Sequence, residues 1–175
     1  MQEDSVEDLV KRNLAATKID KVWVADTTYV PTREGFLYLA CVLDAHSIRI
    51  CGWSMENHLK TKIVLNTLLI ALWRKNLALG LVHHPCYGAQ YAAPSFSERL
   101  REVGITPSME RTGNTPDNAL AEHFLSTLKT ELVSRLKFLS RQAAKTSPSS
   151  TWIPSTTPAA YTHLSATLVP PHSDC

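Results

Sequence analysis

Three consecutive runs of β-branched and aromatic residues constrain this chain most. They read VWVADTTYV, GFLYLACVLDA and IRICGWSM, over residues 22–30, 35–45 and 48–55. Turn-forming residues join them, in PTREG and AHS. Connections this short let successive strands pair only antiparallel. The sequence therefore predicts an antiparallel meander of three strands.

Beyond the meander, helix and strand patterns alternate. LGLVH and ITPSM, at residues 79–83 and 105–109, are short strand candidates. Helices are expected over 60–76, 94–104 and 117–138. The first helix carries an apolar stripe of Ile63, Val64, Thr67, Leu68, Ala71 and Leu72; the last carries Leu120, Phe124, Leu125, Leu128 and Leu132.

Helix boundaries are marked by particular residues. Pro94 opens the second helix and Gly104 closes it, whereas Asp117 suits the N-cap of the third. The resulting order predicts an α/β domain with a mixed sheet. Three antiparallel strands are joined by hairpins, and parallel strands are added through helical crossovers that flank the sheet.

Three regions are expected along the 175 residues. Residues 1–20 form a polar N-terminal arm whose apolar residues recur at helical spacing, and residues 21–146 form the core. With 44% hydrophobic and 19% charged residues, one domain can bury a core. Residues 147–175 are expected to be disordered, because 16 of these 29 residues are Ser, Thr or Pro.

Composition excludes several classes of protein. No apolar run reaches the roughly 18 to 20 residues that span a bilayer, and the acidic start is unlike a secretory signal. The four cysteines are far apart and form no CxxC pair, so a reduced, cytoplasmic protein is expected. The net charge of +2 does not by itself indicate a nucleic-acid partner.

Four separated segments resemble the integrase-type catalytic core of IS3-like insertion-sequence transposases. They are VWVADTTYV, GFLYLACVLDAHSIRICGWSM, HHPCYGAQY and SMERTGNTPDNALAEHFLSTLKTEL, in the order that the family has them. The resemblance covers residues 9–146. It implies a ribonuclease H-like fold in which two Asp and one Glu hold two divalent ions, Mg²⁺ or Mn²⁺.

The chemistry that the resemblance implies is phosphoryl transfer on DNA. Two hard cations stabilise the attacking and leaving oxygens of an in-line displacement at phosphorus, and such cations prefer oxygen ligands. By this resemblance, Asp26 in VADTTY is the first metal ligand and Glu122 in DNALAEHF is the last.

Cys86 occupies the position of the middle aspartate. Similar proteins read His-Ser-Asp and then, one residue later, Gly-Ser-Gln-Tyr, whereas this chain reads HPCYGAQY. The 35 residues between Cys86 and Glu122 match the family's interval. A thiol is mostly neutral at pH 7 and softer than oxygen. We therefore expect weakened metal binding and no Mg²⁺-dependent strand transfer at a normal rate.

Candidate DNA contacts come from basic and polar residues near the last helix. Lys129 occupies the family's basic position, seven residues after Glu122, and is expected to reach a DNA phosphate. Arg111 and Asn114 precede the helix and are expected near the same DNA. Arg99 and Arg101 are further candidates for the DNA backbone, although ordinary solvation explains them equally well.

Other residues have more ordinary interpretations. Asp44 is expected to cap a turn between strands, and His83, His84 and Cys86 are expected not to form a soft-metal site. Cys41 and Cys51 should be small buried hydrophobes. A base-stacking platform is conceivable from five aromatics, but core and sheet-face packing is the favoured interpretation; they are Trp23, Tyr29, Phe36, Tyr38 and Trp53.

The tail lacks the last helix and the Tyr-Asn, His-Ser and Leu-Gly-Tyr fingerprint of similar transposases. In a shifted reading frame, the last base of each codon joins the first two bases of the next codon. Read in this way, the tail can encode much of the missing fingerprint. Trp152 before Ile153 must then encode Asp, and residues 163–167 permit Ser-Leu-Gly-Tyr. We therefore expect that the reading frame slipped near Ser147; a natural Pro-rich linker is the alternative.

The sequence thus predicts the catalytic core of a DDE transposase, as a damaged and inactive copy without room for a preceding helix-turn-helix. DNA is the expected partner, with a homo-oligomer or a mixed oligomer with intact transposase, in the bacterial cytoplasm and on the nucleoid. One alternative is a non-catalytic DNA-binding or transposase-interacting regulator, and another is a Mn²⁺-dependent nuclease with two carboxylates. Loss of the family's last helix predicts marginal stability.

Overall fold

The fold is built on a five-stranded mixed sheet. The computed structural model describes residues 7–10, 16–73, 79–109, 119–133 and 135–147. Its strands are β1 (Val22–Thr32), β2 (Gly35–Asp44), β3 (Arg49–Glu56), β4 (Val82–Pro85) and β5 (Thr106–Pro107). They lie in the order β3-β2-β1-β4-β5. The first three pair antiparallel and the last two are parallel additions, so the predicted mixed sheet is confirmed.

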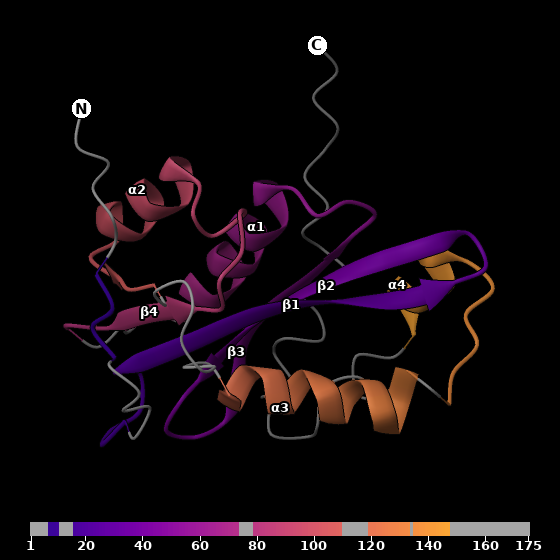
Figure 1. The fold of residues 1–175 in the computed structure, drawn as a ribbon, viewed down its shortest axis with the longest axis horizontal. Coiled ribbons are helices and arrows are strands. Elements are labelled where there is room, and N and C mark those ends of the chain that lie inside the picture. Colours follow the sequence, from indigo (N-terminus) through magenta and orange to yellow (C-terminus); the bar gives the residue numbers. More distant parts are fainter. Residues whose placement is uncertain (1–6, 11–15, 74–78, 110–118, 134, 148–175) are drawn as a thin grey trace, which may run out of the picture.

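Helices cover both faces of the sheet (Figure 1). On one face, α1 (Thr61–Leu72) and α2 (Pro94–Glu102) bury apolar side chains against Trp23, Ala25 and Val42. On the other face, α3 (Ala119–Leu128), the π-helical turn η1 (Lys129–Val133) and α4 (Arg141–Thr146) pack against Val24, Cys41 and Leu43. Alternate residues of each strand thus serve two separate apolar layers.

The helix α1 lies very close to β3. Its buried residues are Ile63, Val64, Thr67, Leu68 and Ala71, as the predicted stripe requires. At Gly52 of β3, a Cβ atom would lie 2.5 Å from the Thr67 carbonyl oxygen. Only glycine permits this approach, and the Ser54 hydroxyl then donates to the Ile63 carbonyl at 2.9 Å.

The boundaries of the helix α2 agree with the predicted start at Pro94 and the predicted stop signal at Gly104. Pro94 stands in its first turn, and Gly104 follows its end with a φ of 76°, which is accessible to glycine at little cost. Phe96, Ser97 and Leu100 are its buried residues. The helix therefore anchors the crossover from β4 to β5.

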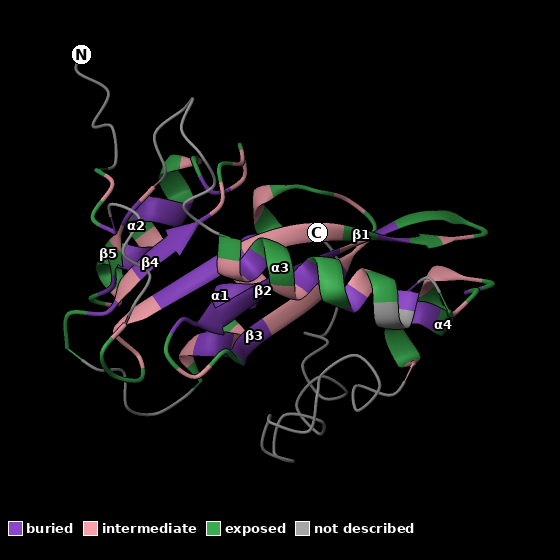
Figure 2. Ribbon diagram, turned by 60° about the horizontal axis from the view of Figure 1, so that its bottom comes forward, coloured by how far each residue is buried: buried purple, intermediate pink, exposed green. Residues whose placement is uncertain are grey.

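The last predicted helix is shorter than its apolar pattern suggested. The prediction of one helix over 117–138 is wrong at its C-terminal end, because α3 stops at Leu128 and η1 ends at Val133. Phe138 instead forms an isolated parallel bridge with Thr32. Ala121, Leu125 and Leu128 are buried, and the opposite side of α3 is exposed (Figure 2). The predicted N-cap Asp117 lies outside the described residues.

Two further segments add details that the sequence analysis did not give. Residues 7–10 are not helical: the Leu9 amide donates to the Ser108 hydroxyl at 2.9 Å, so this piece lies beside β5. The short helix α4 was not predicted, and Ser140 caps it by accepting from the Ala143 amide at 3.0 Å. The expected disorder of the tail concerns residues that, after Ser147, lie outside the described part.

The strands β4 and β5 are also displaced from their predicted limits. LGLVH was expected to form the fourth strand, yet pairing with β1 begins at Val82 and continues to Pro85. β5 is reduced to Thr106 and Pro107. Across the described residues, no helix combines the length and apolarity needed to span a membrane.

Candidate active site

The parallel pairing of β1 with β4 brings Asp26 and Cys86 together. The last residue pair between β1 and β4 is Ala25 with Pro85, and Asp26 and Cys86 are the residues that follow this pair in the two segments. The Cys86 amide donates to the Ala25 carbonyl at 2.8 Å, which fixes the backbone just after β4. Cys86 thus directly follows the carboxyl end of β4, which is a common location for functional groups, whereas Asp26 lies within β1, which continues to Thr32.

The two side chains make a direct hydrogen bond. The Cys86 thiol donates to Oδ1 of Asp26 at 2.7 Å. The same oxygen accepts the Thr27 backbone amide at 2.6 Å. One carboxylate oxygen of Asp26 therefore already serves two donors of the protein.

Burial controls the protonation of this pair. It raises the pKa of Asp26, although the hydrogen bonds from Cys86 and Thr27 and the charge of Lys129 oppose the rise. Burial, and after it the charge of Asp26, raises the pKa of the Cys86 thiol far above its ordinary value. Near neutral pH, Cys86 is thus a neutral thiol, which is a weak metal ligand.

Glu122 and Lys129 lie near this pair. Glu122 is an exposed residue in the first turn of α3, and its charge contributes to the raised pKa of Cys86. Lys129, the first residue of η1, lowers the pKa of Asp26 by its charge. Lys129 is therefore close enough to act electrostatically on Asp26, and Glu122 on Cys86. Arg111 and Asn114 lie outside the described residues.

The Lys129 side chain has a partner that the sequence did not indicate. Its ammonium lies 3.9 Å from the centroid of the Tyr29 ring. Lys129 also begins a π-helical turn, so it does not simply continue the face of α3 that carries Glu122. The predicted phosphate ligand is thus engaged with an aromatic ring of β1.

The donors at this site do not fit a pair of hard divalent ions. Among the described residues, no three His, Cys, Asp or Glu side chains are grouped so that they could hold a metal ion. The nearest pair, Asp26 and Cys86, combines a carboxylate that is already hydrogen-bonded with a neutral thiol. Two hard cations require several oxygen ligands.

Thr27 and Gln90 support the site in a way that sequence reasoning missed. The Gln90 side-chain amide donates to the Thr27 hydroxyl at 3.2 Å and so ties the loop after β4 to β1. Gln90 lies four residues after Cys86, within the segment HHPCYGAQY, which was the available indication.

The alternative candidate residues have structural roles. Asp44 is fully buried and accepts the Asp20 amide at 2.9 Å and the Ser47 amide at 2.8 Å, so its predicted role in a turn is confirmed. Cys41 and Cys51 are buried, as expected. Arg99 forms a 2.9 Å ion pair with Glu102 on α2.

Two adjacent histidines of β4 occupy the core. His83 packs edge-on against Phe96, with ring centroids 5.4 Å apart, and His84 shares a 2.9 Å hydrogen bond with the Ser108 hydroxyl. Burial lowers the pKa of His83 to about 3. A neutral imidazole is therefore part of the packing on the α2 side of the sheet.

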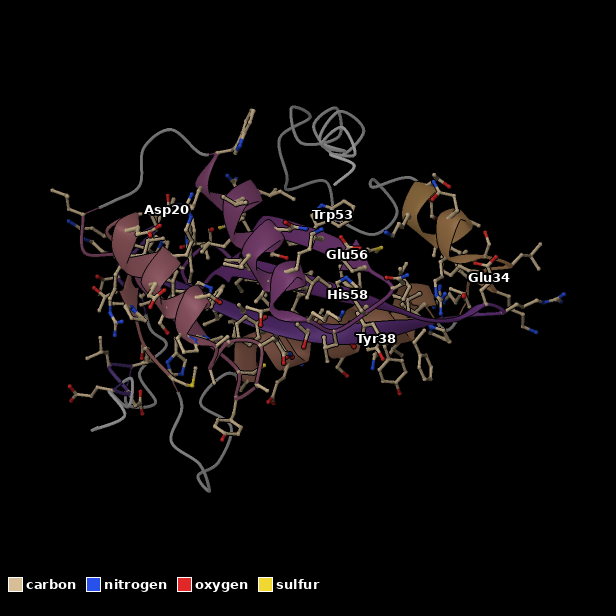
Figure 3. The ribbon with its side chains drawn as sticks, turned by 90° about the horizontal axis from the view of Figure 1, so that it is seen from above. Asp20, Glu34, Tyr38, Trp53, Glu56 and His58 are labelled. Atoms are coloured by element: carbon tan, nitrogen blue, oxygen red, sulfur yellow. The ribbon has the colours of Figure 1, made fainter. Side chains whose placement is uncertain are left out.

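The predicted packing of the aromatic residues is only partly correct. Trp23 is fully buried, and its indole N–H donates to Asp20 at 3.0 Å. Tyr38 and Trp53, labelled in Figure 3, are half-buried on strands β2 and β3. Core packing is wrong for Tyr29 and Phe36, which remain 47% and 52% exposed. At this end of the hairpin α4 packs against the opposite face, where Val30 and Leu37 are fully buried.

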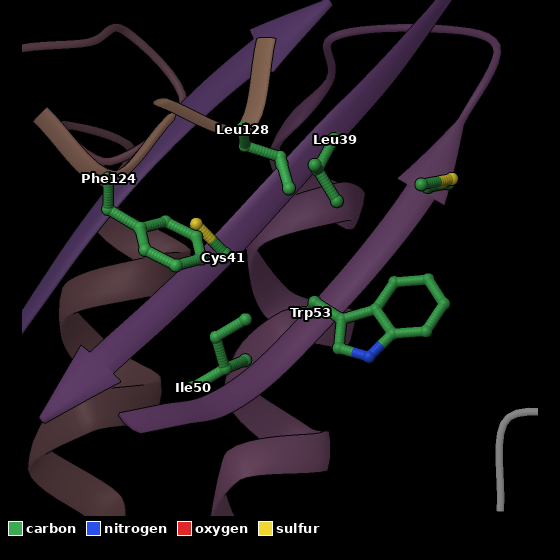
Figure 4. A pocket seen from close by; sticks show the side chains of 7 residues that line it. Leu39, Cys41, Ile50, Trp53, Phe124 and Leu128 are labelled. Atoms are coloured by element: carbon green, nitrogen blue, oxygen red, sulfur yellow. The ribbon is translucent and has the colours of Figure 1, made fainter. Parts of the chain in front are cut away.

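An apolar hollow lies between the strands β2 and β3 and the helix α3 (Figure 4). Its lining contains no polar surface and comprises Leu39, Cys41, Ile50, Trp53, Met55, Phe124 and Leu128. Most of these residues are buried, so the hollow is a small gap in the packing on the α3 side of the sheet.

Comparison with known proteins gives consistent matches. Residues 16–115 match the family model described as "Integrase core domain". The transposase for insertion sequence element IS904 of Lactococcus lactis is 41% identical over 136 residues, covering 78% of this chain and 54% of that protein. The transposase InsF for insertion sequence IS3A of Escherichia coli is 33% identical, covering 78% and 47%.

A solved structure shows the same fold. The HTLV-2 integrase catalytic core domain, determined in complex with magnesium, superposes with a TM-score of 0.54 at 17% identity, covering 69% of this chain and 74% of that one. The likeness identifies the predicted ribonuclease H-like fold. The present chain spans about half the length of the curated relatives that it matches.

Proposed function

This chain belongs to the integrase core domain family, among the IS3-type insertion-sequence transposases, and we propose that it is a copy of their catalytic core that binds DNA but does not transfer strands. The family membership implies the use of divalent metal ions. We propose Asp26 and Glu122 as the remaining metal ligands, with Mg²⁺ or Mn²⁺ bound weakly.

The observation that carries the proposal is the hydrogen bond from Cys86 to Asp26. A neutral thiol replaces an anionic oxygen ligand, and it also occupies an oxygen of the neighbouring carboxylate. The loss of charge weakens attraction for a divalent ion, and a sulfur atom suits magnesium poorly. Metal-dependent displacement at phosphorus needs both ions in place.

The activity test uses the purified full chain with DNA carrying the ends of the related element IS904. We expect no cleavage and no joining in Mg²⁺, for the original chain and for Asp26→Ala alike. Full cleavage and joining by the original chain would refute the proposal. Nicking that appears only in Mn²⁺, and disappears in Asp26→Ala, would instead support the two-carboxylate nuclease.

DNA binding is proposed to rest on Lys129, together with Arg111 and Asn114. A positive side chain next to Asp26 can hold a phosphate without reading the base sequence. We expect affinity to fall steeply with salt, and Lys129→Ala to reduce the slope of log affinity against log salt by about one. An unchanged slope would show that Lys129 does not contact a DNA phosphate.

A regulatory role is the second candidate. The substituted position leaves the sheet and both apolar layers intact, so the chain could still associate as a homo-oligomer or with an intact transposase. Co-purification with the IS904 transposase, and inhibition of that enzyme, would favour this role. If the two proteins elute separately, the mixed oligomer is excluded.

We also propose that residues after Ser147 derive from a shifted reading frame. The composition of residues 147–175 and the codon constraint at Trp152 and Ile153 support it. The coding DNA for residues 80–175, read in all three frames, decides the question. A shifted frame without the family fingerprint would make the tail authentic.

A further inference from the structure

Two exposed aromatic rings lie together at the end of the β1–β2 hairpin. The ring centroids of Tyr29 and Phe36 are 4.8 Å apart with planes tilted by 58°. Each side chain is about half exposed. In Figure 1 this hairpin extends beyond α1 toward α4. An exposed pair of rings on a rigid hairpin presents π-faces at little cost in conformational entropy.

The pair is adjacent to the candidate active site along one strand. Tyr29 lies three residues after Asp26 on β1, about 10 Å along an extended strand, so the two side chains leave opposite faces of the sheet. Lys129 links them at the edge of β1, because its ammonium lies over the Tyr29 ring and its charge acts on Asp26. The strand β4 pairs only with Val22–Ala25. In the described structure, the β4-side edge of β1 beyond Ala25 is met by one isolated bridge, at Thr32. Side chains of Cys86 and Gln90 reach Asp26 and Thr27 here, but among the described residues no strand pairs with this edge of β1 between Asp26 and the rings.

Two positively charged side chains, those of Lys129 and Arg141, lie beside the rings. The Lys129 ammonium lies 3.9 Å from the Tyr29 ring centroid. Arg141 donates from Nε to the Phe36 carbonyl at 3.1 Å. Glu34 is the acidic neighbour, and it accepts the Arg141 amide at 2.9 Å. Rings with flanking cations are the combination that binds single-stranded nucleic acid.

We propose that Tyr29 and Phe36 form a stacking platform for an unpaired base of a DNA strand bound beside Asp26. The inference rests on the proposed DNA-binding function and adds the form of DNA that the site takes. Bases within a duplex are stacked on each other, so only a frayed, flipped or single-stranded base can use these rings. Lys129 supplies the charge for the neighbouring phosphate.

When DNA binds, the Lys129 ammonium should leave the Tyr29 ring for a phosphate, because the two contacts differ in strength. At an exposed site, an ammonium on a ring is a weak interaction, and a phosphate is a stronger partner for it. When the ammonium moves to a phosphate, a face of Tyr29 becomes available to a base. Tyr29, Phe36 and Lys129 therefore act as one binding surface.

The test uses a short single-stranded oligonucleotide with one 2-aminopurine, whose fluorescence is quenched when the base stacks. A distant dye on the same strand reports binding by anisotropy. We expect quenching by the full chain. Tyr29→Leu and Phe36→Leu should lose it and bind roughly five-fold or more weakly, because stacking one base contributes about 1–3 kcal/mol. Phe36→Tyr should retain both properties.

Matched controls separate stacking from general effects. Trp73→Leu removes another exposed ring, on α1, and should change neither signal. Lys129→Ala should lower affinity and the salt slope, whereas Phe36→Leu should leave the slope unchanged. Binding without quenching, or quenching that survives both leucine variants, overturns the stacking platform and leaves DNA binding standing. Absence of any binding overturns both.

Discussion

The thiol of Cys86, the residue after β4, donates a 2.7 Å hydrogen bond to Oδ1 of Asp26 within the neighbouring parallel strand β1. The pair is held by the backbone, because the Cys86 amide binds the Ala25 carbonyl and the Thr27 amide binds the same Asp26 oxygen. Metal-binding carboxylates are expected at both positions. Here the neutral thiol of Cys86 is instead a hydrogen-bond donor to the carboxylate of Asp26.

Replacing the thiol by a carboxylate should create a metal-dependent protein. In metal-free buffer, Cys86→Asp is expected to melt at a lower temperature than the original chain, because two adjacent carboxylates repel each other. Mg²⁺ at ten times its Kd should then stabilise the variant by about 1.4 kcal/mol. Calorimetry with and without Mg²⁺ measures this effect.

The matched control for that experiment is Cys86→Ser, which keeps a neutral side chain. Neither it nor the original chain should gain a comparable shift from Mg²⁺. An equal shift in all three proteins would show that magnesium acts elsewhere, and that Cys86 does not limit metal binding.

Cys86 is half-buried, but it should react with iodoacetamide more slowly than its exposure alone would suggest. Burial and the charge of Asp26 both raise its pKa, so little thiolate is present near pH 8. Asp26→Asn removes that charge, lowers the Cys86 pKa and should speed alkylation. Peptide mass spectrometry over time gives the rate, with buried Cys51 as internal reference. A slower or unchanged rate in Asp26→Asn would be inconsistent with the hydrogen-bonded pair.

Stability should fall as the pH is lowered from neutrality, in part through His83. Burial depresses its pKa from 6.5 to about 3, so between these values the unfolded chain binds a proton that the folded chain does not. This dependence has a limiting slope of about 1.4 kcal/mol per pH unit. The stability contributed by neutral His83 is complete above pH 6.5 and is lost as the pH falls toward 3.

The test compares denaturant unfolding of the original chain and His83→Leu between pH 7 and 5.5, above the range in which most carboxylates titrate. The variant should show the flatter dependence, whatever its absolute stability. Parallel curves for the two proteins would assign the acid sensitivity to other groups.

With a frameshifted tail, as proposed, the face that the family's last helix covers lacks that partner, and the melting midpoint should lie at or below about 50 °C, in the lower part of the range for mesophilic domains. Leu128, which lines the hollow and is 6% exposed, contributes to the remaining packing. Leu128→Ala should lower the free energy of unfolding by about 2–5 kcal/mol.

Leu139 provides the matched control, since it is 62% exposed and Leu139→Ala should change stability by less than about 0.5 kcal/mol. Scanning calorimetry of the three proteins suffices. A cooperative transition of the original chain well above 50 °C would contradict the expected weakness of this face.

The sequence alone determined the local parts of the fold. Turn residues between the runs at 22–55 set the hairpins of β1, β2 and β3, because a short connection admits only antiparallel pairing. The spacing of Ile63, Val64, Thr67 and Leu68 determined the buried face of α1, since residues three and four apart share one side of a helix. The motif resemblance located Asp26, Cys86 and Glu122, although it could not show how their side chains interact.

Only the tertiary structure decided the long-range relationships. β4 starts at Val82 because that residue pairs with Val22, and α3 gives way to η1 at Leu128 despite an apolar pattern that continues. The exposure of Tyr29 and Phe36 depends on which parts of the sheet the helices cover. Strand alternation assigns a side chain to a face but cannot say whether another element covers that face. The contacts of Cys86 with Asp26, and of Lys129 with Tyr29, arise from residues distant in the chain, where local periodicity carries no information.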